Sequence, residues 1–385
     1  SSVRTIASLT WIIFFAVDLG VLFWASAVLR NVLMGWPLWM SIMITAGVVG
    51  LYTYFGGITA VVMTDVVQMV IMFVGGLTLT FLGLHAVGGF DVLVDKITTM
   101  GPEYRSHFDL IQSSDTKTPF PWTGILFGLT FVMANAYMIG NQSIVQRCLT
   151  AKNEWHAKAS MVFASGLKML IPILVLFPGL MAIIIHPGLE DGDQSLPMMI
   201  KSILPPGLIG LVFAAFFAGL MSSVDSILNS TATLFTKDIY EPFIKKGASD
   251  VHYLKVGKLT TLVLLIIGVA TSPISSKFPG IYVAVQTFLS FFQGPLFAIL
   301  LLGIFWKRTT QWGGLSGIII GIGFATVLNL FKGEFFTIED PFLYVSWWSF
   351  LVGFIVTVTV SLITPRHSDL KLEGLVYKRF RKKDK

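Results

Sequence analysis

Apolar stretches of about 20 residues or more recur along the chain, separated by short segments that contain polar residues, glycine or proline. Each stretch can cross the roughly 30 Å hydrocarbon core of a membrane as a helix. The stretches lack the strict alternation of a membrane barrel, so the pattern predicts an all-α integral membrane protein, a helical bundle. We expect about ten spans, at 5–32, 37–57, 58–85, 122–148, 157–185, 205–236, 255–275, 277–306, 311–331 and 342–364.

Composition and charge agree with a membrane location. Hydrophobic residues make up 54% of the chain and charged residues 12%, against about 25% charged in soluble domains. The net charge of +6 gathers most densely at 378–385, after the last apolar stretch, which favours a membrane-surface tail over nucleic-acid binding. The distribution of basic residues predicts a cytoplasmic tail at 366–385, with the connection 86–121 outside. We also expect the membrane to be the plasma membrane. We therefore expect one transmembrane domain over 1–385 in contact with the lipid bilayer.

The usual sequence marks of an enzyme are missing. Cys148 is the single cysteine, so no internal disulfide can form, and neither C-x-x-C nor H-E-x-x-H occurs. We find no phosphate loop of the G-x-x-x-x-G-K type and no nucleophile and base pair. The chain opens with SSVRT, without methionine or a signal pattern, and we expect it to lack an amino-terminal part.

Four charged residues fall well within the predicted spans: Asp18, Asp65, Lys168 and Asp225. A charge at the centre of a bilayer costs about 2.5–3.5 kcal/mol on insertion scales, so each side chain should face the bundle interior and meet a partner or water. Such residues are candidates for function. The alternative, a polar clamp between helices, stays open for Asp18, Asp65 and Lys168.

The segment FFAGLMSSVDSILNSTATLFTKDIY, 216–240, carries a stripe of oxygen atoms. Ser222, Asp225, Ser226, Asn229 and Thr233 are spaced by three or four residues, which places them on one helix face. Hydroxyl and carboxylate oxygens are hard donors that suit a small hard cation, and sodium fits them better than a transition metal. Hydroxyls that bond back to the preceding turn are the alternative, but they do not account for Asp225.

Other polar positions suggest a solute site. Pro172 lacks an N–H, so it should loosen the helix around Lys168, where we expect a buried ammonium. Gln286 offers an amide to neutral polyols, and Gly294-Pro295 should break its helix further on. Gln286 as a bridge between helices and Tyr137 as a core residue are the alternatives.

Several segments together resemble the sodium/solute symporter family, closest to its sodium/sugar branch. They are YFGGITAVVMTDVVQ, GNQSIVQRCLTAK, GLKMLIPILVLFPG, SSVDSILNSTATLFTKDIY and LLLGIFWKR. The resemblance covers essentially the whole chain. It implies a LeuT-like core of two inverted five-helix repeats that works by alternating access. It also implies that this chain begins at the third core helix, with the first two absent.

The resemblance assigns roles to the cation-binding candidates. Ser222 and Ser223 match the serine pair that binds Na⁺, and Gly219 matches the residue whose carbonyl joins them. Asp65 matches an aspartate near the sodium exit path, which in some members binds a second Na⁺ with hydroxyls at the positions of Asp225 and Ser226. Because Asp225 replaces a hydroxyl, two carboxylates would bind a cation more strongly or share a proton, and the stoichiometry stays open.

On the solute side, Lys168 and Gln286 match sugar-binding residues and Tyr137 matches the aromatic inner gate. An asparagine that contacts galactose in a bacterial member aligns with Ala134, so Asn135, one place off, is a weaker substrate-binding candidate. The resemblance implies symport of Na⁺ with a glucose- or galactose-like sugar and no organic cofactor. The alternatives are sodium- or proton-coupled transport of sialic acid, myo-inositol or a carboxylate, and a solute sensor that does not transport. The oligomeric state stays open.

Overall fold

The computed structural model describes residues 2–56, 58–109, 111–368, 372, 376 and 377, except for the side chains of 52, 54–64, 102 and 103. Within these ranges the regular elements are all helical, and they occupy all ten predicted spans. Among the described residues, seven helices are long and apolar enough to cross a membrane, or up to nine if each of two bent pairs is one span. The helix in the remaining predicted span, 37–57, has a shorter apolar part, Leu38–Leu51. The predicted tail at 366–385 lies largely outside the described residues.

The chain forms two compact units: residues 12–110 with 146–284, and residues 1–11 with 111–145 and 285–385. We call them the long unit and the short unit. A single domain over 1–385 stays a prediction.

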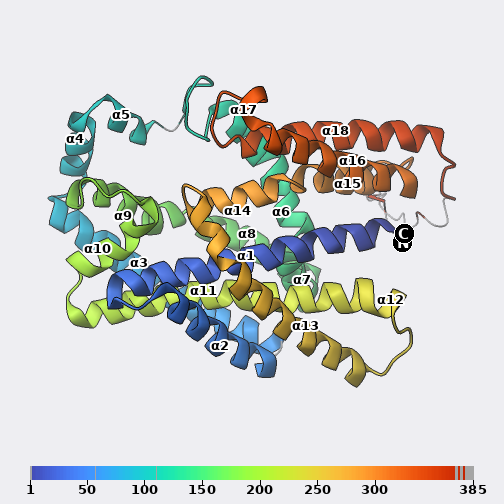
Figure 1. The fold of residues 1–385 in the computed structure, drawn as a ribbon, viewed down its shortest axis with the longest axis horizontal. Helices are drawn as coiled ribbons and strands as arrows, with labels where there is room; N and C mark the ends of the chain where they lie inside the picture. Colours follow the sequence, from blue (N-terminus) through green and yellow to red (C-terminus); the bar gives the residue numbers. More distant parts are fainter. Residues whose placement is uncertain (1, 57, 110, 369–371, 373–375, 378–385) are drawn as a thin grey trace, which may run out of the picture. The chain divides into compact units, whose positions relative to one another are not determined.

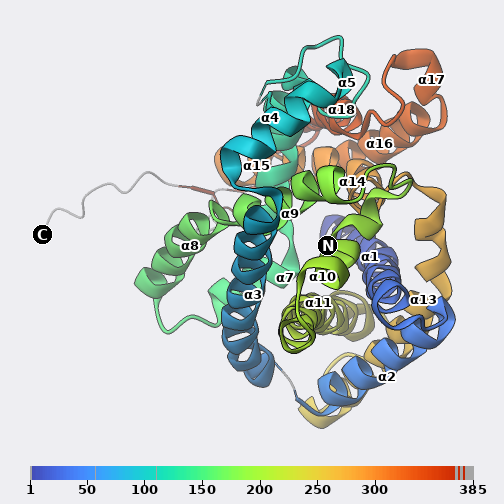
Figure 2. The same ribbon diagram turned by 90° about the vertical axis from the view of Figure 1, so that its left-hand side faces the viewer.

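The long unit takes the greater part of α1 and the helical residues of 35–110 and 146–284 (Figures 1 and 2). Its elements are α1 (Ser2–Met34), α2 (Leu38–Gly56), α3 (Ile58–Val87), α4 (Phe90–Met100), α5 (Pro102–Arg105), α8 (Glu154–Lys168), α9 (Ile171–Ile185), α10 (Ser195–Ile203), α11 (Pro206–Leu234), α12 (Glu241–Phe243) and α13 (Asp250–Thr271). Short 3₁₀ turns occupy Ser106–Phe108, Gly192–Gln194 and Ser272–Lys277, and a π-helix extends α11 over Phe235–Tyr240. The connection 86–121 therefore contains helices of its own.

Small residues let the helices of the long unit approach closely. A β-carbon built on Gly75 of α3 would lie 2.5 Å from the Ala215 β-carbon of α11, so this contact requires glycine. Beyond it, buried Leu79, Met181 and Met199 form the apolar core shared by α3, α9 and α10. This packing holds α3 against α11, the two helices that carry most of the candidate cation ligands.

The short unit contains a π-helix at Gly124–Met133, then α6 (Ala134–Gly140), α15 (Gln293–Phe305), α16 (Gln311–Leu330), α17 (Lys332–Phe335) and α18 (Phe342–Ile363). Three helices, α1, α7 (Gln142–Leu149) and α14 (Ile281–Ser290), each pass from one unit to the other. Helices α16 and α18 lie side by side (Figure 1), and β-carbons built on Gly313 or Gly317 would lie 2.0 Å from the Ser361 or Thr357 hydroxyl. Glycine is therefore required along this seam.

Side chains cap several of the helices. Asn141 Oδ1 accepts from Ser143 N at 2.8 Å at the start of α7, and Asn153 Oδ1 accepts from His156 N at 3.0 Å at the start of α8. Thr310 Oγ1 accepts from Gly313 N at 3.2 Å at the start of α16. Each cap satisfies an N–H that has no partner within its helix, which explains why the helices begin at these residues.

The expected break after Gln286 occurs at a different place. Helix α14 ends at Ser290 and α15 begins at Gln293, and the axes of the two helices differ by 49°. Gly294-Pro295 was wrongly expected to be the break, and lies instead in the first turn of α15. Proline fits there because the first N–H groups of a helix have no acceptor within the helix.

Candidate functional site

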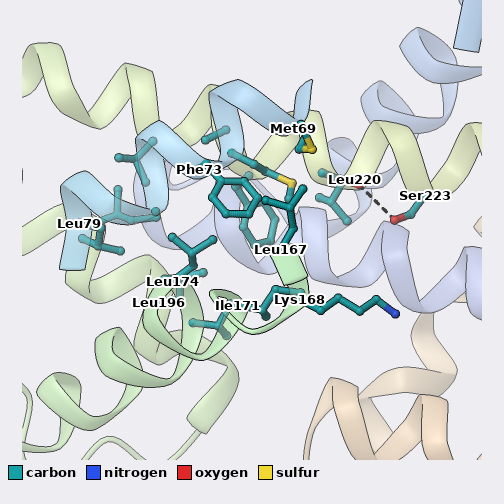
Figure 3. Close-up of a pocket in the computed structure, with 18 of the residues that line it drawn as sticks. Met69, Phe73, Leu79, Leu167, Lys168, Ile171, Leu174, Leu196, Leu220 and Ser223 are labelled. Atoms are coloured by element: carbon teal, nitrogen blue, oxygen red, sulfur yellow. Dashed lines mark hydrogen bonds between the residues drawn. The ribbon is translucent and has the colours of Figure 1, made fainter. Parts of the chain in front are cut away.

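Five of the six predicted cation ligands lie on α11, and Asp65 lies on α3. Ser223 Oγ donates to the Gly219 carbonyl at 3.1 Å, and the Ser223 side chain is exposed. Both residues line an apolar cavity of about 560 Å³ formed by α3 and α8–α11 (Figure 3). Oxygens that surround a cation of the size of Ca²⁺, close to that of Na⁺, lie about 2.3–2.6 Å from it. Two oxygens 3.1 Å apart are therefore close enough to share one ion.

Ser222 belongs to a different set of contacts, centred on Asp65 of α3. Its hydroxyl donates to Asp65 Oδ1, while Asp65 Oδ2 accepts from Arg147 Nη2 at 2.6 Å. The same Nη2 donates to Ser226 Oγ at 2.6 Å. The Asp65 side chain is 18% exposed and that of Arg147 33%, so the ion pair is partly shielded from solvent. We call these four residues the Asp65 network.

Asp225 of α11 has a hydrogen-bond partner on α2. It is fully buried and accepts a hydrogen bond from Thr53 of α2. Asp225 bonds to a threonine of α2, and Asp65 bonds to an arginine of α7. A cation held by both carboxylates stays a prediction.

Back-bonding explains part of the polar stripe on α11. Ser226 Oγ donates to the Ser222 carbonyl at 2.6 Å, and Ser230 Oγ to the Ser226 carbonyl at 2.6 Å. Thr233 does the same to the Asn229 carbonyl at 2.9 Å. Back-bonding, the alternative raised from sequence, is confirmed for Ser226 and Thr233 of the stripe, whereas Ser222 bonds to a carboxylate instead.

Helix α7 makes a second polar contact with α11 one turn further along. Gln146 Nε2 donates to Ser230 Oγ at 3.1 Å, and Asn229 Nδ2 donates to Gln146 Oε1 at 3.3 Å. A bend of 51° separates α7 from the preceding helical segment. Gln146 and Arg147, which are adjacent on α7, therefore contact two successive turns of α11.

The remaining charges within spans differ in burial. Asp18 is half-buried on α1. Arg30, near the end of that helix, is a fifth such charge that we did not count among the candidates. It is 6% exposed, donates to the Ser41 carbonyl at 2.8 Å, and places its guanidinium 4.1 Å from the centre of the Phe217 ring. Cation–π contact and hydrogen bonds take the place of a carboxylate partner at this position.

Lys168 differs from its predicted environment. Its helix does end there, with α8 closing at Lys168 and α9 starting at Ile171, as Pro172 led us to expect. The expectation of a buried ammonium is wrong, because the side chain is exposed and extends away from the apolar residues of the cavity (Figure 3). The break in the helix leaves a long flexible side chain at the cavity edge, free to reach outward.

The other solute-binding candidates belong to the short unit or to α14. Asn135 Nδ2 donates to the Thr130 and Phe131 carbonyls at 3.0 and 2.9 Å, so its donors are used within its own helical segment. Tyr137 on α6 and Gln286 on α14 are both half-buried. Their roles in gating and solute binding stay predictions.

A model of the sodium:solute symporter family matches residues 1–321 of the chain. The chain belongs to this family. Its members are secondary transporters and not enzymes, sodium is their coupling ion, and they carry no organic cofactor. The symporter chain is accordingly a multi-pass membrane protein.

Two relatives are sodium/glucose cotransporters. The chain is 32% identical to that of Vibrio parahaemolyticus over 387 residues, which is 95% of the chain and 70% of the relative. It is 31% identical to sodium/glucose cotransporter 1 of Sus scrofa over 400 residues, which is 92% of the chain and 60% of the relative. The symporter chain thus spans less than two thirds of the pig protein.

A solved structure supports the fold. A Na⁺-coupled sialic acid symporter, in a substrate-bound outward-open state, matches with a TM-score of 0.79 at 22% identity, over 95% of this chain and 76% of the other. The predicted LeuT-like architecture is confirmed by this neighbour.

Sequence reasoning did not find Arg147, Gln146 or Thr53 as members of the symporter's polar networks. Arg147 lies at the end of the predicted span 122–148, within the quoted segment GNQSIVQRCLTAK. Its partner Asp65 is 82 residues away in the chain. An arginine at a span end, next to a membrane helix that carries an unpaired aspartate, is the signal that points to such a pair.

Proposed function

We propose that the protein couples the inward movement of Na⁺ to uptake of a glucose- or galactose-like sugar across the plasma membrane, with its carboxyl tail in the cytoplasm. The relatives' names support sugar as the solute class. The observation that carries the cation part is the Ser223 hydroxyl, 3.1 Å from the Gly219 carbonyl at the cavity lining. In this proposal Gly219, Ser222 and Ser223 bind the coupling ion.

Coupling then follows from alternating access. Na⁺ entry down about 100 mV releases about 2.3 kcal/mol, plus its concentration term. If both solutes bind the outward-facing state better than the inward-facing one, each raises the affinity for the other. Lys168 and Gln286 would bind the solute, and Tyr137 would form the inner gate.

A second candidate solute is sialic acid or another carboxylate. The exposed Lys168 ammonium favours it, because a flexible cation at a cavity edge can pair with a carboxylate. The fold neighbour, a sialic acid symporter, agrees with this choice. Lys168→Gln separates the candidates, because it should reduce carboxylate uptake far more than uptake of a neutral sugar.

The test is uptake of labelled glucose, galactose and sialic acid into proteoliposomes that contain the protein expressed from its complete reading frame. Uptake is measured with and without an inward Na⁺ gradient at a clamped membrane potential. We expect Na⁺-dependent accumulation of a sugar that Ser223→Ala abolishes. Ser160→Ala is the matched control, because it removes an exposed back-bonded hydroxyl from α8. Accumulation that ignores the Na⁺ gradient would refute the proposal, whereas Na⁺-driven uptake of sialic acid alone would favour the second solute.

A further inference from the structure

The Asp65 network already contains a positive charge at the place where a cation would bind. Arg147 Nη2 lies 2.6 Å from Asp65 Oδ2 and 2.6 Å from Ser226 Oγ. Cations with oxygen ligands keep them at about 2.3–2.6 Å. One guanidinium nitrogen therefore occupies the position that an ion ligated by this carboxylate and this hydroxyl would take.

The hydroxyl of Ser226 is oriented toward that position. Its proton is donated to the Ser222 carbonyl at 2.6 Å, so its lone pairs face Arg147. The hydroxyl of Ser222 donates to the other oxygen of the same carboxylate. Carboxylate and hydroxyl oxygens converge as they would around a metal ion, but the cation is supplied by the chain itself.

We propose that Arg147 acts as a tethered cation that keeps this second cation site closed to Na⁺. The charges of Asp65 and Arg147 cancel, so an added Na⁺ would meet the guanidinium at ligand distance, where like charges repel strongly. The protein then binds a single coupling ion, at the site proposed above. This inference rests on the proposed function, and it identifies Arg147 as the residue that determines stoichiometry.

The experiment counts bound Na⁺ on the complete protein in detergent by equilibrium binding of radioactive ²²Na⁺, with K⁺ in place of Na⁺ as the blank. We expect about one Na⁺ per wild-type protein and about two for Arg147→Gln, which removes the charge but keeps hydrogen-bonding groups. Asp65→Asn combined with Arg147→Gln should return the count to about one. Arg147→Lys should also give the lower count, because it keeps a positive charge.

Controls separate this inference from the proposed function. Lys158→Gln removes a positive charge from an exposed pair on α8 and should leave the Na⁺ count unchanged. Variants are compared only after size-exclusion chromatography shows a single folded species. If Arg147→Gln is not folded, Asp65→Asn in the wild-type background decides, because it should leave the Na⁺ count unchanged. A wild-type protein that binds two Na⁺, or an Arg147→Gln protein that still binds one, overturns the inference, whereas a wild-type protein that binds none refutes the proposed function.

Discussion

The ion pair between Asp65 and Arg147 can be measured apart from transport. The perturbation is a double-mutant cycle with Asp65→Asn, Arg147→Gln and both together, in medium without Na⁺. Coulomb's law at an effective dielectric constant of about 20 gives about 6 kcal/mol of direct attraction at the observed 2.6 Å. Desolvation of two charges that are 18% and 33% exposed offsets the greater part of this attraction.

We expect a coupling energy of about 2 kcal/mol, within the roughly 1.5–3 kcal/mol found for hydrogen bonds to charged groups. The stability losses of the two single variants should add up to more than the loss of the double variant, because each single variant leaves one charge without its partner. The assay is equilibrium unfolding in mixed detergent micelles. A coupling energy below about 0.5 kcal/mol, typical of exposed pairs, would refute the idea that the network holds a shielded charge.

Three further predictions concern other parts of the molecule. Gly313→Ala should destabilise the protein by about 1–3 kcal/mol, because its β-carbon would lie 2.0 Å from Ser361 Oγ. Gly323→Ala, in the same helix with nothing within 4 Å, should be neutral or stabilising, and equal melting temperatures of the two variants would contradict this packing. Burial raises the pKa of Asp193, which accepts from Ile281 N at 2.9 Å. The contribution of Asp193 to stability should thus be greatest below its ordinary pKa of 3.8 and be lost as pH rises through the folded value. Asp193→Asn should remove this pH dependence from the unfolding midpoint. An unchanged pH dependence would show that another group causes it. Gln286→Ala should weaken the apparent affinity for a sugar at least tenfold, about 1.4 kcal/mol, and an unchanged affinity in the uptake assay would exclude Gln286 from the solute site.

Hydrophobic pattern alone was enough to place the helices, because a backbone in lipid must satisfy its own hydrogen bonds and a helix is the local way to do so. The breaks were harder to place. Pro172 and Pro295 each lie in the first turn of a helix, so each interruption comes just before the proline rather than at it.

The candidate site was predictable where the signal is local. The spacing of Ser222, Asp225 and Ser226 indicates a polar face on one helix without knowledge of the fold. Which partner each oxygen meets depends on residues far away in the chain: Thr53 is 172 positions from Asp225, and Arg147 is 79 positions from Ser226. Periodicity carries no information about such pairs. That an arginine pairs with the carboxylate of Asp65 could therefore be learned only from the fold.

The back-bonded hydroxyls of α11 have a kinetic consequence. Ser223 donates its proton to the Gly219 carbonyl, and its side chain is exposed at the cavity lining. An arriving ion therefore finds a lone pair in place and needs no rotation of the hydroxyl, while the helix loses little order when the ion departs. Ion exchange at this position should be fast compared with the movement of whole helices, so the rate of the transport cycle would be limited by conformational change rather than by capture of the ion.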